Sequence, residues 1–430
     1  MKKQSFLMLS LLIFSACIVT TRVGVVKGEL KTIVVPEDYS SVQEAVDKAF
    51  EGDVVLVKNG TYNGSIVINK QITLIGEDKA DTIIQGDWSL NGTVVLVEHD
   101  EVVVENLTLK AAYDAGPHGR GIHLLNIKSC KVSGCNFESY VGVWLYQASN
   151  NTIENDFIDG TNAGMPPVIG IKLQLSDDNR IVSNDVLDYS YGFGISLESS
   201  DRNVLEKNQL LNNYNGIWVK DSNNNNFTDN KVTVTLEVFL RFEDNVILGC
   251  YGIRLYHSSN NSITDNSFVD CPKGVRIWSS SCYNVIENNT VSGSQFVGIE
   301  LIEDSNYNQI TGNSIIDNEV GANFTNSSNN QIHHNNFINN GVLVSFRSTD
   351  EPNFFDDSIE GNYWSDYNGT DSNGDGIGDS PYNIDENNQD NYPLMGPIII
   401  LEFPSWTILP LVLIITLFLV VGKRKLCACI

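Results

Sequence analysis

Short apolar stretches recur along most of the chain at a nearly constant spacing. The clearest pattern is Gly-[Ile/Val]-x-[Leu/Val/Ile], a glycine followed by two aliphatic residues one position apart. Its copies begin at Gly121, Gly142, Gly170, Gly194, Gly216, Gly252, Gly274 and Gly298, with weaker copies at Gly321 and Gly341. Between them, Ser- and Asn-rich stretches lead into a second pattern, [Ile/Val]-x-x-Asn-x-[Phe/Val/Ile], as in residues 263–268. Most copies of the first pattern therefore lie 20 to 24 residues apart.

Alternation of apolar and polar residues over a few positions predicts short strands, and the polar stretches between them predict turns. The repeat therefore favours an all-β fold, a right-handed, single-stranded parallel β-helix over residues 59–346. We expect roughly 13 coils of about 22 residues, each adding about 4.8 Å to a rod. Asn tolerates left-handed turns, and its amide can pair with the Asn one coil away. A β-propeller is excluded because its blades need about 40 residues or more.

Both ends of such a solenoid need a cover. Residues 29–58 predict an N-terminal strand and a capping helix, because Ser41 and Glu44 form a capping box that opens the amphipathic segment 42–50. Residues 347–396 lose the repeat and predict a C-terminal cap.

The two termini read as membrane signals. Residues 1–28 have a basic start and an apolar run, which is typical of a signal peptide. Residues 403–422 are apolar enough for a transmembrane helix, and the basic segment 423–430 that follows predicts a cytoplasmic tail. We therefore expect a single-pass protein of the cell membrane, with the β-helix on the extracellular side and the membrane as one partner.

Charge adds to this interpretation. Seven of the 27 basic residues lie in the terminal segments, which leaves 20 against 53 acidic residues and a net charge of −33 for the region between. Such a surface excludes nucleic acid as a partner. Eleven Asn-x-Ser/Thr sites are consistent with a glycosylated exterior. Five cysteines lie between the terminal segments, and an odd number cannot all pair; Cys250 and Cys271 are one coil apart.

Several segments of the chain carry a family resemblance. Residues 33–36, 41–46 and 52–76 resemble the opening of pectinesterase-type β-helices. The later coils, with residues 361–364 and 390–394, resemble the NosD-like, carbohydrate-binding-and-sugar-hydrolase family of the pectin-lyase-like superfamily, in an archaeal-type, surface-anchored form. The resemblance implies a right-handed parallel β-helix. It leaves the activity open, because the family contains enzymes, sugar-binding proteins and copper-site maturation factors.

Acid, base and cation side chains gather within ten residues, where they could support β-elimination or epimerisation of a uronic acid. These candidate catalytic residues are Asp114, His118, Arg120 and His123. The alternative is a solvated loop. Copper is not favoured as a cofactor, because Cu(I) prefers sulfur ligands and the region between the terminal segments has only Met165 and Met395.

A calcium loop is the best local metal motif. Oxygen ligands alternate as in the first half of an EF-hand, with glycine at the sixth position. The ligands would be Asp371, Asn373, Asp375, the carbonyl of Ile377, and Asp379. Tyr382 stands where an EF-hand has its final Glu, so the loop departs from that motif. We expect Ca²⁺ here to hold the C-terminal cap.

In Gly-Ile-x-Leu-x the two aliphatic side chains point inward, so both x positions point outward on one sheet. Read in register, these positions gather aromatic and basic residues. The predicted ligand-binding residues are Trp144, Tyr146, Lys172, Trp218, Lys220, Arg254, Tyr256, Arg276 and Trp278. Aromatic rings beside cations suit acidic polysaccharides or surface glycans. Insertions at 111–120, 160–169 and 232–249 leave from one corner and would either wall this face or cover it.

Two classes of function thus stay open. One is a non-catalytic surface module that binds glycans or acts as an adhesin-like scaffold. The other is a polysaccharide lyase, hydrolase or epimerase, and a copper-related accessory protein is a lesser alternative. Carboxylates facing the aromatic residues would favour an enzyme.

Overall fold

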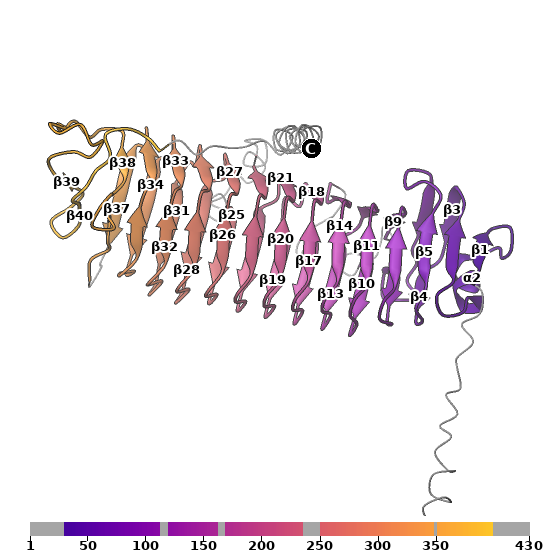
Figure 1. The fold of residues 1–430 in the computed structure, drawn as a ribbon. Helices are drawn as coiled ribbons and strands as arrows, with labels where there is room; N and C mark the ends of the chain where they lie inside the picture. Colours follow the sequence, from indigo (N-terminus) through magenta and orange to yellow (C-terminus); the bar gives the residue numbers. More distant parts are fainter. Residues whose placement is uncertain (1–29, 112–118, 162–167, 235–249, 348–350, 399–430) are drawn as a thin grey trace, which may run out of the picture.

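The computed structural model describes residues 30–111, 119–161, 168–234, 250–347 and 351–398. In these ranges three strands per coil stack into three long parallel sheets (Figure 1). Two sheets have 13 strands and the third has 12, so the predicted all-β solenoid of about 13 coils is confirmed.

Sheet A contains β1 (Thr32–Val35), β2 (Val54–Val57), β5 (Thr73–Gly76), β8 (Val103–Glu105), β11 (Lys131–Ser133), β14 (Thr152–Glu154), β17 (Arg180–Val182), β20 (Val204–Glu206), β23 (Asn226–Thr228), β26 (Ser262–Thr264), β29 (Val285–Glu287), β32 (Gln309–Thr311) and β35 (Gln331–His333). Sheet B contains β3 (Gly60–Asn63), β6 (Thr82–Gln85), β9 (Thr108–Lys110), β12 (Asn136–Glu138), β15 (Phe157–Asp159), β18 (Asp185–Leu187), β21 (Gln209–Leu211), β24 (Lys231–Thr233), β27 (Ser267–Val269), β30 (Thr290–Ser292), β33 (Ser314–Ile316), β36 (Asn336–Ile338) and β38 (Tyr363–Trp364). Sheet C contains β4 (Ile66–Ile68), β7 (Thr93–Val97), β10 (Arg120–Leu125), β13 (Val141–Tyr146), β16 (Ile169–Gln174), β19 (Phe193–Glu198), β22 (Asn215–Lys220), β25 (Tyr251–Tyr256), β28 (Lys273–Trp278), β31 (Val297–Ile302), β34 (Val320–Thr325) and β37 (Val342–Arg347).

The stack begins earlier in the chain than the repeat predicts. β1 already pairs with β2, so the first strand of sheet A starts at Thr32 rather than near residue 59. Helix α2 (Val42–Lys48) lies between these strands, and it ends two residues before the predicted end of the amphipathic segment. Its cap is as predicted, because the Ser41 hydroxyl accepts a hydrogen bond from the Glu44 amide. The apolar side of α2 is buried and packs on β1, β2 and β4, so this helix covers the N-terminal end.

The repeated glycine is required by close backbone approach. At Gly216 a Cβ atom would lie 2.4 Å from Val232 Cγ1 and 2.5 Å from the carbonyl oxygen of Gly252 in the next coil. A side chain there would push the coils apart. The aliphatic residue after the glycine fills the interior, as Ile217 and Ile253 do with no exposed surface.

Buried asparagines form two ladders that run along the rod. The first, at the turn before sheet A, contains Asn151, Asn179, Asn203, Asn225, Asn261, Asn284, Asn308, Asn330 and Asn353. The second, between sheets A and B, contains Asn184, Asn208, Asn230, Asn266, Asn289, Asn313, Asn335 and Asn362. The predicted pairing of Asn amides between coils is therefore confirmed.

Asn208 shows how a ladder amide is bonded on both sides. The Asn208 oxygen accepts from the backbone N–H and the side-chain Nδ2 of Asn184, at 3.1 and 3.0 Å. Its own Nδ2 donates to Asn230 Oδ1 at 2.9 Å and to the Ile181 carbonyl at 2.8 Å. Because an unpaired buried polar group costs free energy, these bonds fix the register of one coil on the next.

Asp156 occupies the first rung of the second ladder. Its Oδ1 accepts from the Cys135 amide at 2.7 Å, but its Oδ2 is buried without a hydrogen-bond partner. An asparagine here would offer a donor to the Asn184 oxygen, which a carboxylate lacks. Burial raises the pKa of the Asp156 carboxyl well above its ordinary value, because it penalises the charged form. The protonated acid has an O–H that can donate a hydrogen bond, as an amide would.

The C-terminal cap continues the stack for one partial coil. β38 pairs with β36, and Trp364 stacks on Phe337 with ring centres 4.6 Å apart. The Asp390 carboxylate accepts hydrogen bonds from the Asn362 amide and Trp364 Nε1, which closes the second ladder with an acceptor. A two-stranded antiparallel sheet of β39 (Tyr382–Asn383) and β40 (Gln389–Asp390) follows.

Over the described ranges, which start at residue 30 and end at residue 398, no helix is long and apolar enough to cross a membrane. The predicted signal peptide, transmembrane helix and tail lie outside these residues.

Replacing Asn208 with Ala should lower the free energy of unfolding by about 3 kcal/mol, because several ladder groups would each lose a partner worth about 1–3 kcal/mol. Urea denaturation followed by circular dichroism measures this change. Asn260 is the matched control, since it is exposed in a left-handed turn (φ 57°) that glycine also adopts. Asn260→Gly should leave stability unchanged, and equal effects of the two substitutions would contradict the ladder's role.

Asp156→Asn should stabilise the protein at pH 7 by about 1–3 kcal/mol, the cost of one unsatisfied buried polar group. The raised pKa means that the folded chain holds this proton more tightly than the unfolded chain. The proton's contribution to stability is complete below the unfolded pKa, about 3.9, and is lost as pH rises through the folded pKa. The advantage of the variant should therefore grow with pH. An advantage independent of pH would show that Asp156 is not protonated on folding.

Candidate functional site

The outward positions of sheet C form three columns, because successive strands pair in exact register. The first two are the predicted ones. Column one reads His123, Trp144, Lys172, Ser196, Trp218, Arg254, Arg276 and Glu300. Column two reads Leu125, Tyr146, Gln174, Glu198, Lys220, Tyr256, Trp278 and Ile302. The register therefore brings all nine predicted ligand-binding residues onto one face.

The third column holds the residue before each glycine and was missed by the sequence pattern. It reads Arg120, Val141, Ile169, Phe193, Asn215, Tyr251, Lys273 and Val297. The signal was the position before the glycine, because the glycine and the next residue both face the interior and break the alternation. Val141, Ile169, Asn215 and Tyr251 of this column are nevertheless buried. This column adds Arg120, Tyr251 and Lys273 to the cations and aromatic rings of the face.

One group of these side chains, the N-terminal cluster, centres on Trp144. The His123 ring stacks on the indole with centres 4.6 Å apart and an interplanar angle of 10°. The Arg120 guanidinium lies 4.4 Å from the indole centre, and the Lys172 ammonium lies 5.0 Å from it. Tyr146 packs edge-on against the same ring at 6.0 Å. The Trp144 ring is thus surrounded by two basic side chains, an imidazole and a tyrosine ring.

A second group, the central cluster, is built around Arg254. Its guanidinium lies 4.5 Å from the ring centre of Trp218 and 4.4 Å from that of Trp278. Tyr251 lies 5.0 Å from the same guanidinium and accepts a hydrogen bond from Arg276. Arg276 lies 4.8 Å from the Trp278 ring centre. Rings and cations therefore alternate across three coils.

Carboxylates on this face are held in pairs with cations or donors. Glu300 lies 3.1 Å from the Lys273 ammonium and 3.3 Å from Arg276. Glu198 lies within 4 Å of the ammonium groups of two lysines. Glu303 accepts a hydrogen bond from Trp278 Nε1 at 2.6 Å. Such pairing suits orientation of a ligand better than the acid and base work of a catalytic carboxylate pair.

The basic groups of the face are partly removed from water. Burial lowers the pKa of Arg120, Lys172 and Arg254. It also lowers the pKa of His123 to about 4, with Arg120 adding to the effect, so this imidazole is neutral near pH 7. The attraction between a cation and an anionic ligand is stronger where the cation is partly buried than where it is in open water. His123 Nε2, Trp144 Nε1 and Arg254 Nε are buried without a hydrogen-bond partner.

The predicted catalytic group is only partly described. Asp114 and His118 lie outside the described residues, as do most of the three insertions. Arg120 and His123 both lie against the Trp144 ring, and their catalytic role stays a prediction.

The predicted calcium loop is an exposed turn attached to the C-terminal cap. Asp371 Oδ1 accepts from the Gly374 amide at 2.7 Å, and Asp379 Oδ2 accepts from the amide and hydroxyl of Ser372. The Met395 amide donates to the Gly376 carbonyl at 2.9 Å, which ties the loop to the end of the cap. Calcium binding here stays a prediction.

The five described cysteines are all free thiols, and four of them are buried. Burial raises the pKa of the Cys250 thiol to about 12 and that of Cys130 to about 11, so neither is a reactive thiolate at neutral pH.

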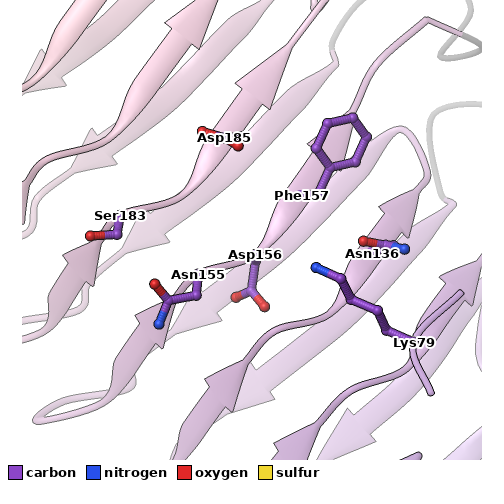
Figure 2. Close-up of a pocket in the computed structure, with 7 residues that line it drawn as sticks. All are labelled: Lys79, Asn136, Asn155, Asp156, Phe157, Ser183 and Asp185. Carbon is purple, nitrogen blue, oxygen red and sulfur yellow. The ribbon is translucent and has the colours of Figure 1, made fainter.

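A hollow of about 480 Å³ lies elsewhere on the rod, between neighbouring coils (Figure 2). It is lined by Lys79, Asn136, Asn155, Asp156, Phe157, Ser183 and Asp185. Figure 2 shows the Lys79 side chain extending toward Asp156, the first rung of the second ladder. Phe157 is its aromatic residue, so this hollow offers much less stacking surface than the face of sheet C.

Comparison with known proteins gives two family matches. Residues 93–238 match the right-handed β-helix region, and residues 237–369 match NosD, the periplasmic copper-binding protein family. The chain is also similar to a cell surface glycoprotein of Methanothermus fervidus, with 26% identity over 344 residues. This match covers 70% of the chain and 52% of the relative, so the chain spans about half the length of that protein.

Solved structures support the fold. The Dettilon tailspike protein aligns with a TM-score of 0.60 at 12% identity, over 73% of this chain and 68% of that one. PfbA, a surface adhesin of Streptococcus pneumoniae, aligns with a TM-score of 0.56 at 13% identity, over 71% and 90%. The repeat, the stacked coils and the two consecutive family matches show that the chain is a right-handed parallel β-helix protein, and its residues 237–369 are similar to NosD.

Proposed function

We propose that this surface β-helix protein binds acidic polysaccharides on the outer face of sheet C without transforming them. The observation that carries the proposal is the central cluster, where Arg254 lies between Trp218 and Trp278 at 4.5 and 4.4 Å. A sugar ring can stack on an indole while a nearby guanidinium pairs with its carboxylate or sulfate.

The strongly acidic charge of the rest of the chain makes the basic residues on this face more significant. With 20 basic residues against 53 acidic ones between the terminal segments, a random surface patch would repel a polyanion. The face instead gathers Arg120, Lys172, Lys220, Arg254, Lys273 and Arg276. At about 0.1 M salt, charges further than about 10 Å away are largely screened, so these local cations dominate what a ligand experiences.

A binding role accounts for the site better than catalysis does. Glu198 and Glu300 are each paired with two cations, which leaves the face without two carboxylates placed for acid and base work among its described residues. The enzyme alternative would instead rely on Asp114 and His118 in the insertion.

The proposed location is the cell surface, where the similar glycoprotein of Methanothermus fervidus is placed by its name. In this proposal residues 1–28 direct secretion and residues 403–422 anchor the chain, with the β-helix outside and the segment 423–430 inside. An outward-facing rod would carry its binding face clear of the membrane.

We also propose that Ca²⁺ binds the loop of residues 371–379 and holds the C-terminal cap. Support comes from the spacing of Asp371, Asn373 and Asp375, and from the attachment of Gly376 to Met395.

Alanine at Trp144, Trp218 or Trp278 should weaken binding of the full-length chain to polygalacturonate by about tenfold each, the effect of losing about 1.4 kcal/mol at a binding hot spot. Affinity electrophoresis in gels containing the polymer measures the change. Binding should also fall as salt rises, and a neutral dextran should not retard the chain.

Tyr283→Ala is the matched control for these substitutions. Tyr283 is an exposed ring that stacks on Tyr307 at 5.4 Å, away from the face of sheet C. Its loss should not alter retention. Unchanged retention of all three tryptophan variants, with the fold intact by circular dichroism, would refute the binding face.

Calcium should raise the melting temperature of the full-length chain, and EDTA should reverse the effect. Asp375→Asn should remove most of the calcium dependence, whereas Glu386→Gln, an exposed carboxylate outside the predicted ligands, should retain it. Differential scanning calorimetry measures the melting temperature with calcium and with EDTA. A melting temperature that calcium does not change would refute the calcium site.

A further inference from the structure

Two adjacent histidines lie where the last coil meets the C-terminal cap. His333 ends β35, and His334 follows it in a left-handed turn with φ of 57°. The segment of residues 353–361 runs alongside, since the Ile332 amide donates to the Phe354 carbonyl and the His334 amide donates to the Gly361 carbonyl, both at 2.7 Å. The cap thereby brings acidic side chains to this turn.

The turn concentrates groups that can bind a metal. The Nδ1 atoms of His333 and His334 lie 2.7 Å apart, and one ligand atom from each of these imidazoles and from Asp357 lies within 4.8 Å of the others. Across the described residues this is the one group of three or more His, Cys, Asp or Glu side chains with that proximity. Because the residues are 23 or 24 positions apart in sequence, the folded cap is what assembles them.

The Asp357 carboxylate is held in place beside the two imidazoles. The amides of Ile359 and Glu360 donate to Asp357 Oδ1, each at 2.8 Å. These bonds fix the position of the carboxylate in the cap.

A further carboxylate holds His334 as metal-bound histidines are usually held. Glu360 Oε2 lies 3.0 Å from His334 Nε2, so Nε2–H donates to the carboxylate and Nδ1 keeps its lone pair for a ligand. Carboxylates in this position orient a metal-bound imidazole and make it more basic. Without a metal, the short Nδ1–Nδ1 contact would be a single N–H···N hydrogen bond, which accounts for the two rings but not for the convergence of Asp357.

We propose that His333, His334 and Asp357 bind a divalent first-row transition-metal ion such as Zn²⁺, with Glu360 orienting His334. Two imidazoles and one carboxylate suit such an ion, whereas Ca²⁺ prefers oxygen ligands alone. A Cu(I) site would need the sulfur ligands that this turn lacks. Three protein ligands leave further coordination positions for water or another ligand.

The proposed metal would join the last coil to its cap. His333 and His334 belong to the stack, whereas Asp357 and Glu360 belong to the segment that covers it. An ion bound only in the folded state stabilises that state, by about 2.7 kcal/mol when free metal is at 100 times its dissociation constant. This role is independent of the polysaccharide face of sheet C.

Isothermal titration calorimetry of the metal-free, full-length chain with Zn²⁺ tests the site. The expected result is one Zn²⁺ per chain, lost in His334→Gln and in Asp357→Asn, and a dissociation constant raised 10- to 100-fold in Glu360→Gln. Replacing Zn²⁺ with Co²⁺ should give the visible absorption of a nitrogen-bound ion in the wild type and not in His334→Gln.

His257→Gln is the matched control, because His257 also lies beside a carboxylate, Asp221 at 3.5 Å, in an exposed turn. It should bind Zn²⁺ as the wild type does. Asp357 is exposed, so Asp357→Asn separates loss of a ligand from loss of the fold, which circular dichroism checks. The proposal is overturned if the wild type binds no Zn²⁺, or if His334→Gln and Asp357→Asn bind it with unchanged affinity.

Discussion

The register of one coil on the next is the constraint on which the rest of this structure depends. Backbone hydrogen bonds alone fix this register weakly, but a slip of one residue would turn the buried aliphatic side chains outward. The two lines of buried asparagines fix the register further, since the same slip would leave amides such as Asn208 without partners in an apolar interior. The chain accordingly keeps one asparagine per coil from Asn151 to Asn353 in the first ladder and from Asn184 to Asn362 in the second, while the loops around them vary in length.

Strict register converts a one-dimensional repeat into a patterned surface. Outward positions that recur once per coil line up at the spacing of paired strands, about 4.8 Å, which is close to the thickness needed for stacked rings and cations. Trp218, Arg254 and Trp278 form a continuous stack only because their strands pair without offset. The same constraint explains why insertions leave the coils at corners, where no ladder or strand is interrupted.

Much of this could be predicted from the sequence, and the limits have physical causes. The Gly-Ile-x-Leu repeat determines which side chains point into the coil and which point outward. The nine aromatic and basic residues on the outer face were therefore identified from the sequence. The column that contains Tyr251 and Lys273 was missed, because the glycine and the next residue both face the interior and break simple alternation. Asp156 looked like any polar turn residue, since its burial depends on the neighbouring coils. The group of His333, His334 and Asp357 was not predicted either, because the cap that assembles it has no repeat.

The central claim is that coil register creates a face for acidic sugars, and a crystal structure of the chain with an oligogalacturonate tests it most directly. The account predicts sugar rings stacked on Trp144 or in the cluster of Trp218 and Trp278, with a carboxylate within hydrogen-bond distance of Arg120, Lys172, Arg254 or Arg276. A ligand bound on sheet A, sheet B or the hollow beside Asp156, with the face of sheet C empty, would contradict it.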